Sequence, residues 1–597
     1  MELSIKQALD KGVEAHKLGK LKVAKTFYQA ILKSQPNHPE ANHNMGLLES
    51  SIGKIDLALP FFKVALESNS NNSNIEQFWL SYIDALIKKE QFKNATDMLE
   101  RAKEKNMTGD NFNVLEAQKE LGRLSLHKSS NDQNKALRSE FIKAHFNLGN
   151  TLLKVGRLKE AESSYRDTLV IDGDLLEAHT NLGVTLKEQG RLEEAQSSLR
   201  KAILINPNYS DAHYNLGITL KELGRLDEAE KSYIKTIKSK PNSPEAYCNL
   251  GNMLKELGRL SEAENYLKQS IALKPENAEF HNNLGVVFKA LGRLEEAEAS
   301  YTKAIELKNG FISALMNRWQ LFYDKRQFND ALKDLDLCNT ETSRAFSLET
   351  LYALGNIDEI FKRIEMSAEL DDCNIRMAAF SSFIAEREKR DTAHKFCKNP
   401  LSFLYFSNLS SHLENSHEFI KELIGELNNL ETIWEPPQRT TSKGFQTLPH
   451  INIFENPLDK MKELKSIILL ELDNYYSKFQ NESCTYIKKW PSKKNLRGWH
   501  VILKKQGCQT THIHTSGWLS GVIYLKVIPT LGKNEGAIEF SLNGDNYSDL
   551  NSPKLTYQPE LGDIIFFPSS LHHRTIPFST DDDRIIVSFD LTPDFAL

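Results

Sequence analysis

The sequence predicts a multidomain chain: an all-α array of repeated helix pairs, followed by a jelly-roll β domain with supporting helices. The first observation is a pattern of glycine and alanine that recurs every 34 residues through much of the first half of the chain. Repeats of this length are typical of stacked helical units. The second observation is a change after Glu482 to short β-branched runs separated by turn residues. Such runs are typical of a β sandwich or a jelly roll.

The helical repeat is strictest between residues 141 and 345. Each unit has a first glycine, a second glycine seven residues later and an alanine five residues after that. They are Gly149, Gly183, Gly217, Gly251 and Gly285; Gly156, Gly190, Gly224, Gly258 and Gly292; and Ala161, Ala195, Ala229, Ala263 and Ala297. We expect the first glycine and the alanine to let the paired helices approach closely, and the second glycine to end the first helix in a left-handed conformation. A helix–turn–helix unit of 34 residues is the period of the tetratricopeptide (TPR) repeat.

An asparagine stands two residues before the first glycine of each unit. These asparagines are Asn147, Asn181, Asn215, Asn249 and Asn283. The first helix of each unit lines the concave groove of a TPR array, and an amide side chain offers both donors and an acceptor. The array resembles the TPR superhelix of the O-linked N-acetylglucosamine transferase, where such a ladder holds protein substrates, and this resemblance implies a peptide in the groove. The alternative is that the asparagines brace neighbouring repeats or face water.

The 34-residue period decays on both sides of the regular array, and this decay sets the expected domain boundaries. We expect degenerate TPR units over 1–110, an irregular linker over 111–140 with a loop at 129–134, the regular array over 141–345, a helical cap and connector over 346–435, and the jelly-roll domain over 436–597. Within the last range, a helix over Leu458–Phe479 precedes the strands. The expected strands are Cys484–Lys488, Gly498–Lys504, Leu519–Val527, Ala537–Leu542, Asp563–Phe567 and Arg584–Leu591.

Histidines stand at two places in the expected β domain. His512 and His514 are separated by one residue, so they would project from the same face of a strand. His572 and His573 follow an apolar strand, and alternation in an extended chain would turn His573 toward the first pair and His572 away. Arg584 follows His573 by 11 residues and opens the last strand.

The order of these motifs resembles the Fe(II)- and 2-oxoglutarate-dependent oxygenases. The closest resemblance is to a bacterial family that reads His-x-His, then Ser-Gly-x-x-Tyr, then Gly-x-x-x-x-Phe-Pro-Ser-x-Leu-x-His. It implies an Fe(II) site formed by His512, His514 and His573. Most of the superfamily has a carboxylate where this chain has His514. The alternative is that His514 supports the site while water or another residue completes the coordination of the metal.

The same resemblance implies 2-oxoglutarate as a cosubstrate. Arg584 would form a bidentate salt bridge with its distal carboxylate, and the hydroxyls of Tyr524 and Ser588 would lie beside it. Ascorbate is an optional further cofactor. We expect His500, on a neighbouring strand, to be structural.

Composition argues against several classes of protein. The net charge of -5 disfavours binding to nucleic acid through bulk charge. No run of 18 apolar residues predicts a membrane span, and no signal-peptide pattern is present. The six cysteines are scattered, which is typical of a reduced, cytoplasmic protein. The oligomeric state is left open.

Together these features predict an enzyme: a dioxygenase that hydroxylates a protein or peptide captured by the TPR groove. The alternative is a non-catalytic TPR interaction scaffold whose jelly-roll domain is structural or senses a ligand. A glycosyltransferase is disfavoured because residues 436–597 lack an alternating strand–helix pattern. The sequence neither names the substrate nor decides between hydroxylation and demethylation.

Overall fold

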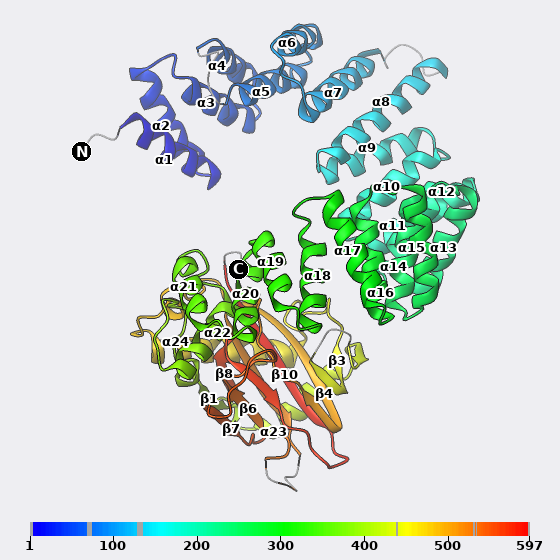
Figure 1. The fold of residues 1–597 in the computed structure, drawn as a ribbon. Helices are drawn as coiled ribbons and strands as arrows, with labels where there is room; N and C mark the ends of the chain where they lie inside the picture. The colour runs from blue at the N-terminus through cyan, green and yellow to red at the C-terminus, as the bar shows by residue number, and fades with distance from the viewer. Residues whose placement is uncertain are drawn as a thin grey trace. The chain divides into compact units, whose positions relative to one another are not determined.

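The computed structural model describes residues 4–68, 74–127, 135–436, 440–528, 532 and 534–594. The chain divides into two compact units, Met1–Glu276 and Asn277–Leu597. The first unit is helical, and the second combines helices with all the strands of the described residues (Figure 1). Within the described residues, no helix is long and apolar enough to cross a membrane.

The first unit is a succession of antiparallel helix pairs, as the repeat predicts. Its helices are α1 (Ile5–Lys17), α2 (Leu21–Ser34), α3 (Pro39–Ser51), α4 (Ile55–Ser68), α5 (Ile75–Lys88), α6 (Phe92–Glu104), α7 (Asp110–His127), α8 (Lys135–Lys154), α9 (Leu158–Ile171), α10 (Leu176–Glu188), α11 (Leu192–Ile205), α12 (Ser210–Glu222), α13 (Leu226–Ser239), α14 (Pro244–Glu256) and α15 (Leu260–Leu273). The irregular linker expected over 111–140 is wrong, because α7 and the start of α8 occupy most of it. The loop expected at 129–134 lies outside the described residues.

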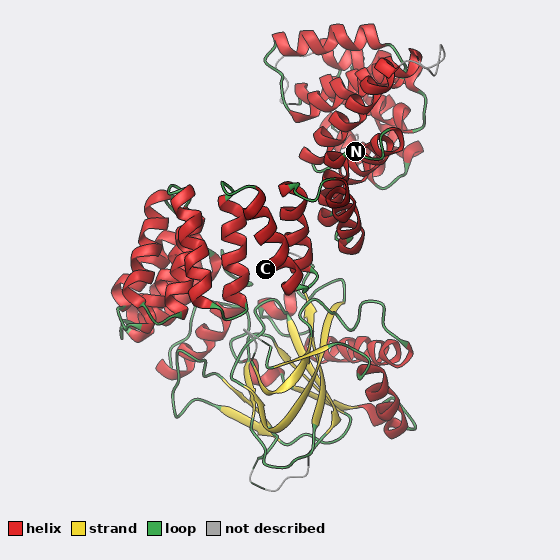
Figure 2. Ribbon diagram, turned by 90° about the vertical axis from the view of Figure 1, so that its right-hand side faces the viewer, coloured by secondary structure: helices red, strands yellow, loops and turns green. Residues whose placement is uncertain are grey.

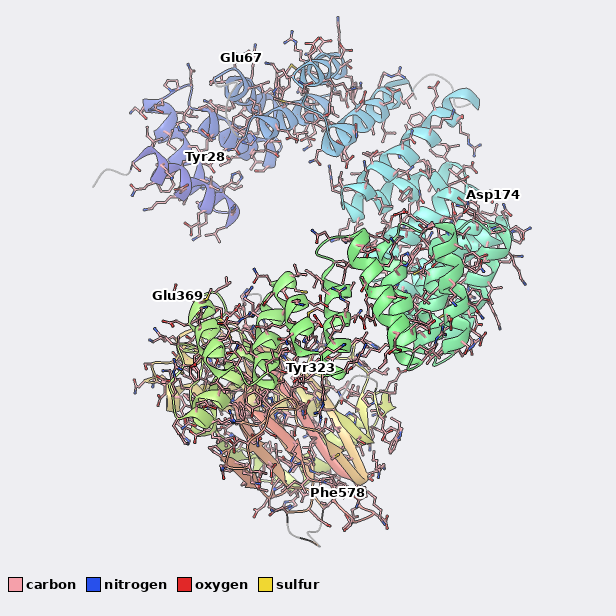
Figure 3. All side chains as sticks on the ribbon, in the orientation of Figure 1. Tyr28, Glu67, Asp174, Tyr323, Glu369 and Phe578 are labelled. Carbon is pink, nitrogen blue, oxygen red and sulfur yellow. The ribbon has the colours of Figure 1, made fainter. Side chains whose placement is uncertain are left out.

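The glycines act in the two ways expected. A Cβ added to Gly217 would lie 2.7 Å from Cε1 of Tyr233, so only glycine lets α12 and α13 approach this closely. Gly12 is in the same situation against Tyr28 of the first helix pair (Figure 3). The second glycine of each unit is left-handed, as Gly224 shows with a φ of +74°.

The second unit begins with further helix pairs. Its helices are α16 (Ala278–Ala290), α17 (Leu294–Leu307), α18 (Ile312–Asp324), α19 (Phe328–Cys338), α20 (Glu341–Ala353), α21 (Ile357–Ser367), α22 (Ile375–Glu388), η1 (Pro400–Phe403), η2 (Leu409–Ser411), α23 (Ser416–Leu427), α24 (Asp459–Phe479) and α25 (Thr485–Lys488). The expected helix at 458–479 is confirmed as α24.

Antiparallel strands form two facing sheets, which confirms the jelly-roll class (Figure 2). The strands are β1 (Tyr405–Asn408), β2 (Thr432–Trp434), β3 (Thr441–Thr447), β4 (Asn495–Gln509), β5 (Leu519–Lys526), β6 (Ile538–Ser541), β7 (Lys554–Tyr557), β8 (Asp563–Pro568), β9 (His572–Thr575) and β10 (Arg584–Thr592). The large sheet has the order β1-β8-β5-β10-β4-β3-β2, and the small sheet has the order β7-β6-β9.

Two expectations about this domain fail. The strand expected at Cys484–Lys488 is the short helix α25. Its β-branched composition is overridden by packing, because Tyr486 and Ile487 are consecutive residues that are both buried in the core. The sheet also begins before residue 436, since β1 pairs with β8 from within the segment expected to be a helical connector.

Alternate residues of the large sheet serve two hydrophobic cores. Residues such as Ile523 and Phe566 face the helices α23 and α24 in one core. Residues such as Val522 and Phe567 face the small sheet in the other. The second core also takes in α20, α21 and α22, so the last helices of the array belong to the interior of the β domain.

Residues 543–549, in the loop between β6 and β7, contact the last helices of the array. The ring of Tyr547 lies 4.9 Å from that of Phe380 and 4.7 Å from that of Phe383, both on α22. Asn546 donates a hydrogen bond of 2.8 Å to the buried carboxylate of Glu349 on α20. Polar and aromatic contacts therefore fix the end of the helical array to the loop.

Candidate metal centre and its cavities

Three histidines from two segments meet between the sheets. His512 and His514 lie in the connection from β4 to β5, and not in a strand as expected, while His573 lies in β9. A two-way backbone bridge joins the segments, because the amides of His512 and His573 each donate to the carbonyl of the other over 3.1 Å. One ligand nitrogen from each of the three imidazoles lies within 4.8 Å of the other two.

Hydrogen bonds fix the same tautomer in all three rings. Nδ1 of His512 donates to the carbonyl of Thr510 over 2.6 Å, and Nδ1 of His573 donates to the carbonyl of Leu571 over 3.2 Å. Nδ1 of His514 donates to Oδ1 of Asp590 over 2.5 Å. Since carbonyl and carboxylate oxygens only accept, Nδ1 carries the proton in each ring. Each Nε2 therefore keeps a lone pair for a metal ion.

Asp590 is a candidate site residue that sequence reasoning missed. It is buried in β10 and also accepts a hydrogen bond of 2.7 Å from Ser520. A Cβ at Gly517 would lie 2.9 Å from Cγ of this carboxylate, so the glycine leaves room for it. The one signal in the sequence is an acidic residue within the apolar run at 585–591.

Burial favours the neutral form of two of the imidazoles, those of His512 and His573. It lowers the pKa of His512 to about 3, with a further contribution from the neighbouring His514. It also lowers the pKa of His573 well below its ordinary value. Metal binding requires neutral imidazole, so His512 and His573 have the protonation state that a metal ligand needs.

Arg584 lines a narrow cavity that the three histidines also line. The cavity has a volume of about 20 Å³, and its walls include His512, Tyr524 and Ser588. Arg584 is 1% exposed and makes no ion pair with any described residue. Its Nη1 lies 3.3 Å from the hydroxyl of Thr575, and its Cζ lies 5.0 Å from the centre of the Tyr524 ring. Its Nε and the hydroxyl of Tyr524 have no hydrogen-bond partner among the described residues.

A buried guanidinium without a counter-ion is costly, and a carboxylate ligand would satisfy it. Burial also lowers the pKa of Arg584. The residues expected to bind 2-oxoglutarate, Arg584, Tyr524 and Ser588, thus line one cavity with the histidines. A donor set of three imidazoles and a nearby unpaired guanidinium fits Fe(II) with an anionic cosubstrate.

A wider cavity of about 330 Å³, called the outer cavity below, shares lining residues with the first one. The segment 446–449 and Arg497 form part of its lining, together with His512 and His514. Trp499 and Gln509 line both cavities. The two cavities therefore share these side chains as well as those of His512 and His514.

Family models match both parts of the chain. The model described as "Putative 2OG-Fe(II) oxygenase" matches residues 497–590. TPR models match residues 144–177, 186–250, 251–292 and 278–311. The chain is a TPR protein with a 2OG-Fe(II) oxygenase-type domain. A search of curated proteins found no match.

Solved TPR structures resemble the helical part of this TPR protein. A Pseudomonas aeruginosa pilF structure is 23% identical, with a TM-score of 0.31, covering 35% of this chain and 97% of that one. YrrB, titled a TPR protein with an unusual peptide-binding site, is 23% identical, with a TM-score of 0.28, covering 32% and 95%. A MamA structure is 22% identical, with a TM-score of 0.27, covering 28% and 93%.

Two further histidines of the C-terminal domain lie outside the cluster. His500 hydrogen-bonds through Nδ1 to Thr447 over 3.0 Å, and burial lowers its pKa to about 4. His572 projects to the opposite side from His573, where its ring lies 5.6 Å from that of Tyr547. The β6–β7 loop held by α20 and α22 thus contacts the residue next to a candidate metal ligand.

The asparagines of the TPR array are partly engaged with neighbouring helices. The amide nitrogen of Asn181 donates to Asn150 over 2.8 Å, and that of Asn249 donates to Tyr214 over 3.1 Å. Asn215 bonds to the carbonyl of Asp211 in its own helix, and Asn147 is exposed. Bracing between repeats thus occurs at Asn181 and Asn249. Asn283 lies in α16 of the second unit.

Proposed function

We propose that this TPR protein is an Fe(II)- and 2-oxoglutarate-dependent dioxygenase that hydroxylates a protein or peptide segment. One observation carries the proposal: the unpaired, buried Arg584 lines a cavity that also contains three metal-competent imidazoles. A metal-binding scaffold alone has no use for such a cation. Its cost to stability is explained if an anionic cosubstrate binds there.

Each residue has a defined task in this proposal. His512, His514 and His573 would hold Fe(II) through Nε2, and Asp590 would orient His514. Arg584 would bind the distal carboxylate of 2-oxoglutarate, aided by the hydroxyls of Tyr524 and Ser588. Bound there, Fe(II) supplies the activation of O₂.

The reaction balances without a further reductant. One oxygen atom of O₂ enters a C–H bond of the substrate as a hydroxyl group. The other enters the carboxylate of succinate, as 2-oxoglutarate loses carbon dioxide. The protein positions the reactants and excludes water. Of the four electrons that O₂ takes up, the substrate supplies two and 2-oxoglutarate supplies the other two.

The TPR array supplies the peptide in this proposal. Its first helices would present Asn147, Asn181, Asn215, Asn249 and Asn283 to an extended segment. The amide oxygens would accept hydrogen bonds from the peptide backbone, since the nitrogens of several are engaged. Capture by the array would raise the local concentration of the peptide at the iron.

Anaerobic titration of the full-length protein with Fe(II) and 2-oxoglutarate tests the proposal. We expect a weak visible charge-transfer band in the wild type, and its loss in His573→Ala with folding intact. Absence of the band in iron-loaded wild type would exclude the dioxygenase assignment. Recovery of protein partners without any iron-dependent turnover would favour the scaffold alternative.

A further inference from the structure

We propose that the outer cavity selects a substrate segment that presents a carboxylate, and that Arg497 is the residue that selects it. This inference rests on the proposed function, because it names the substrate class of the same site. Three features of the outer cavity carry it: its charges, the pairing of β4 with β10, and its hydrogen-bond donors.

The lining of the outer cavity contains one cation and one anion, Arg497 and Asp590. Asp590 is buried, and its carboxylate already accepts from His514 and Ser520. Arg497 is exposed and makes no ion pair with any residue that the structure describes. The charge available to a ligand in this cavity is therefore positive.

Strand pairing shows why Arg497 is left without a counter-ion. Arg497 and Asp590 are direct cross-strand partners in the antiparallel pair of β4 and β10, so their side chains leave the same face of the sheet. Opposite charges at such positions normally attract each other. Here the carboxylate turns to His514 and to Ser520, which is its partner on β5. Asp590, which would otherwise pair with Arg497, therefore orients the candidate metal ligand His514 instead.

The guanidinium is held at the wall of the cavity. Nη2 of Arg497 donates to the carbonyl of Pro449 over 3.0 Å, and Pro449 also lines the cavity. The side-chain oxygen of Gln446 accepts a hydrogen bond of 2.9 Å from the hydroxyl of Thr441. The NH₂ group of Gln446 can therefore donate to a ligand. Arg497 and Gln446 both line the cavity and both offer hydrogen-bond donors, which is chemistry suited to a carboxylate.

The size of the cavity limits what it takes. A volume of about 330 Å³ lies at the small end of ligand sites, and it suits one or two side chains of an extended segment. We therefore assign aspartate or glutamate as the recognised side chain. The oxygen atom would enter a C–H bond of that residue or of its immediate neighbour, with succinate and carbon dioxide as the other products.

The experiment uses the full-length protein with Fe(II), 2-oxoglutarate, O₂ and a random peptide library, and mass spectrometry locates each added oxygen. We expect the products to be enriched in an acidic residue at or beside the modified position. For the best product sequence, Arg497→Gln should raise KM at least tenfold and reduce the preference for the acidic peptide over its amide counterpart. Arg497→Lys, which keeps a positive charge, should retain part of the preference for the acidic peptide. The matched control is Arg390→Gln, at an exposed arginine that follows α22 and does not line the outer cavity.

Products without acidic enrichment, no product from the library, or an unchanged preference in Arg497→Gln would each overturn the inference. The charge-transfer band separates this failure from failure of the proposed function. If the wild type shows the band but has no acidic preference, the dioxygenase proposal stands and the substrate class falls. If the band is absent in iron-loaded wild type, the dioxygenase proposal itself falls.

Discussion

His514 and Asp590 lie 76 positions apart in the chain, yet they are joined by a hydrogen bond of 2.5 Å between Nδ1 and Oδ1. A carboxylate in this position holds the imidazole in one tautomer and increases its basicity. We expect Asp590→Asn to weaken metal affinity by about 10–100-fold. Competition with a chelator under anaerobic conditions measures it. Asp583→Asn, at a carboxylate that pairs with Lys504 away from the cluster, should leave the affinity unchanged. Equal affinities in the two variants would contradict the role of Asp590.

Arg584 makes no ion pair with any residue that the structure describes, and its burial is unfavourable. We expect Arg584→Met to stabilise the metal-free protein by about 1–3 kcal/mol, because an unsatisfied buried polar group is removed. The same variant should lose any stabilisation by Fe(II) with 2-oxoglutarate. Denaturant unfolding with and without the two ligands gives both quantities. Lys505→Met, at an exposed lysine, should change neither. A destabilised Arg584→Met that still responds to 2-oxoglutarate would refute the assignment.

His500 should make stability depend on pH. Its pKa is about 4 in the folded protein, because burial disfavours the charged ring, against an ordinary value of 6.5. The unfolded chain therefore binds more protons between these values, and stability falls as pH drops from about 6.5 to about 4. The loss at the lower limit is at most about 3 kcal/mol. Urea unfolding across this range should show a shallower decline in His500→Gln. In His417→Gln, at an exposed position, the decline should match the wild type; a wild-type decline in His500→Gln would be the contrary result.

Two helical glycines should respond to alanine in opposite directions. Alanine is favoured over glycine in a helix by about 1 kcal/mol. At Gly217 the new Cβ would lie 2.7 Å from the buried ring of Tyr233, and overpacking of about 1–3 kcal/mol outweighs that gain. At Gly425 of α23 nothing lies within 4 Å, so the gain remains. We expect Gly217→Ala to lower the thermal stability of the protein and Gly425→Ala to raise it. Two changes of the same sign would contradict the close-approach explanation.

A chain that begins at residue 436 should not fold, although the sequence places a domain boundary there. It lacks β1 and β2 of the large sheet, as well as α20–α22 of the second core. A chain that begins at Thr340 keeps all of these elements, and we expect it to unfold cooperatively. Circular dichroism with thermal unfolding compares the two. Cooperative unfolding of the 436–597 chain would show that the helices are dispensable.

Short-range spacing explains how much of the fold the sequence predicts. The period of the glycines is local, so Gly217 and Gly224 indicate helix contacts and helix ends without any knowledge of tertiary structure. The strands β4, β5, β8 and β10 are confirmed because each is a long, strongly patterned run. The short strand β6 was also predicted. The strands β1, β2, β3, β7 and β9 were not, and all of these except β3 have only three or four residues, which carry little pattern.

Long-range pairing explains what the sequence does not predict. Whether Arg497 faces Asp590 depends on the register of β4 with β10, and no local pattern encodes it. The supporting role of Asp590 is hidden for the same reason, whereas His512, His514 and His573 were found by motif order. Tyr486 and Ile487 gave a wrong strand because their composition shows burial but not the helix that achieves it.

Tyr547 sits between α22 and His572, so the helices at the end of the array share one interior with the jelly roll. Repeat proteins lengthen and shorten in evolution by gain and loss of whole units. In this architecture such changes are tolerable upstream, where each unit contacts only its neighbours. From α20 onward a deletion would open the hydrophobic interior of the oxygenase-type domain. Homologous proteins should therefore differ in the number of their repeats, but they should retain α20, α21 and α22 together with the loop at residues 543–549.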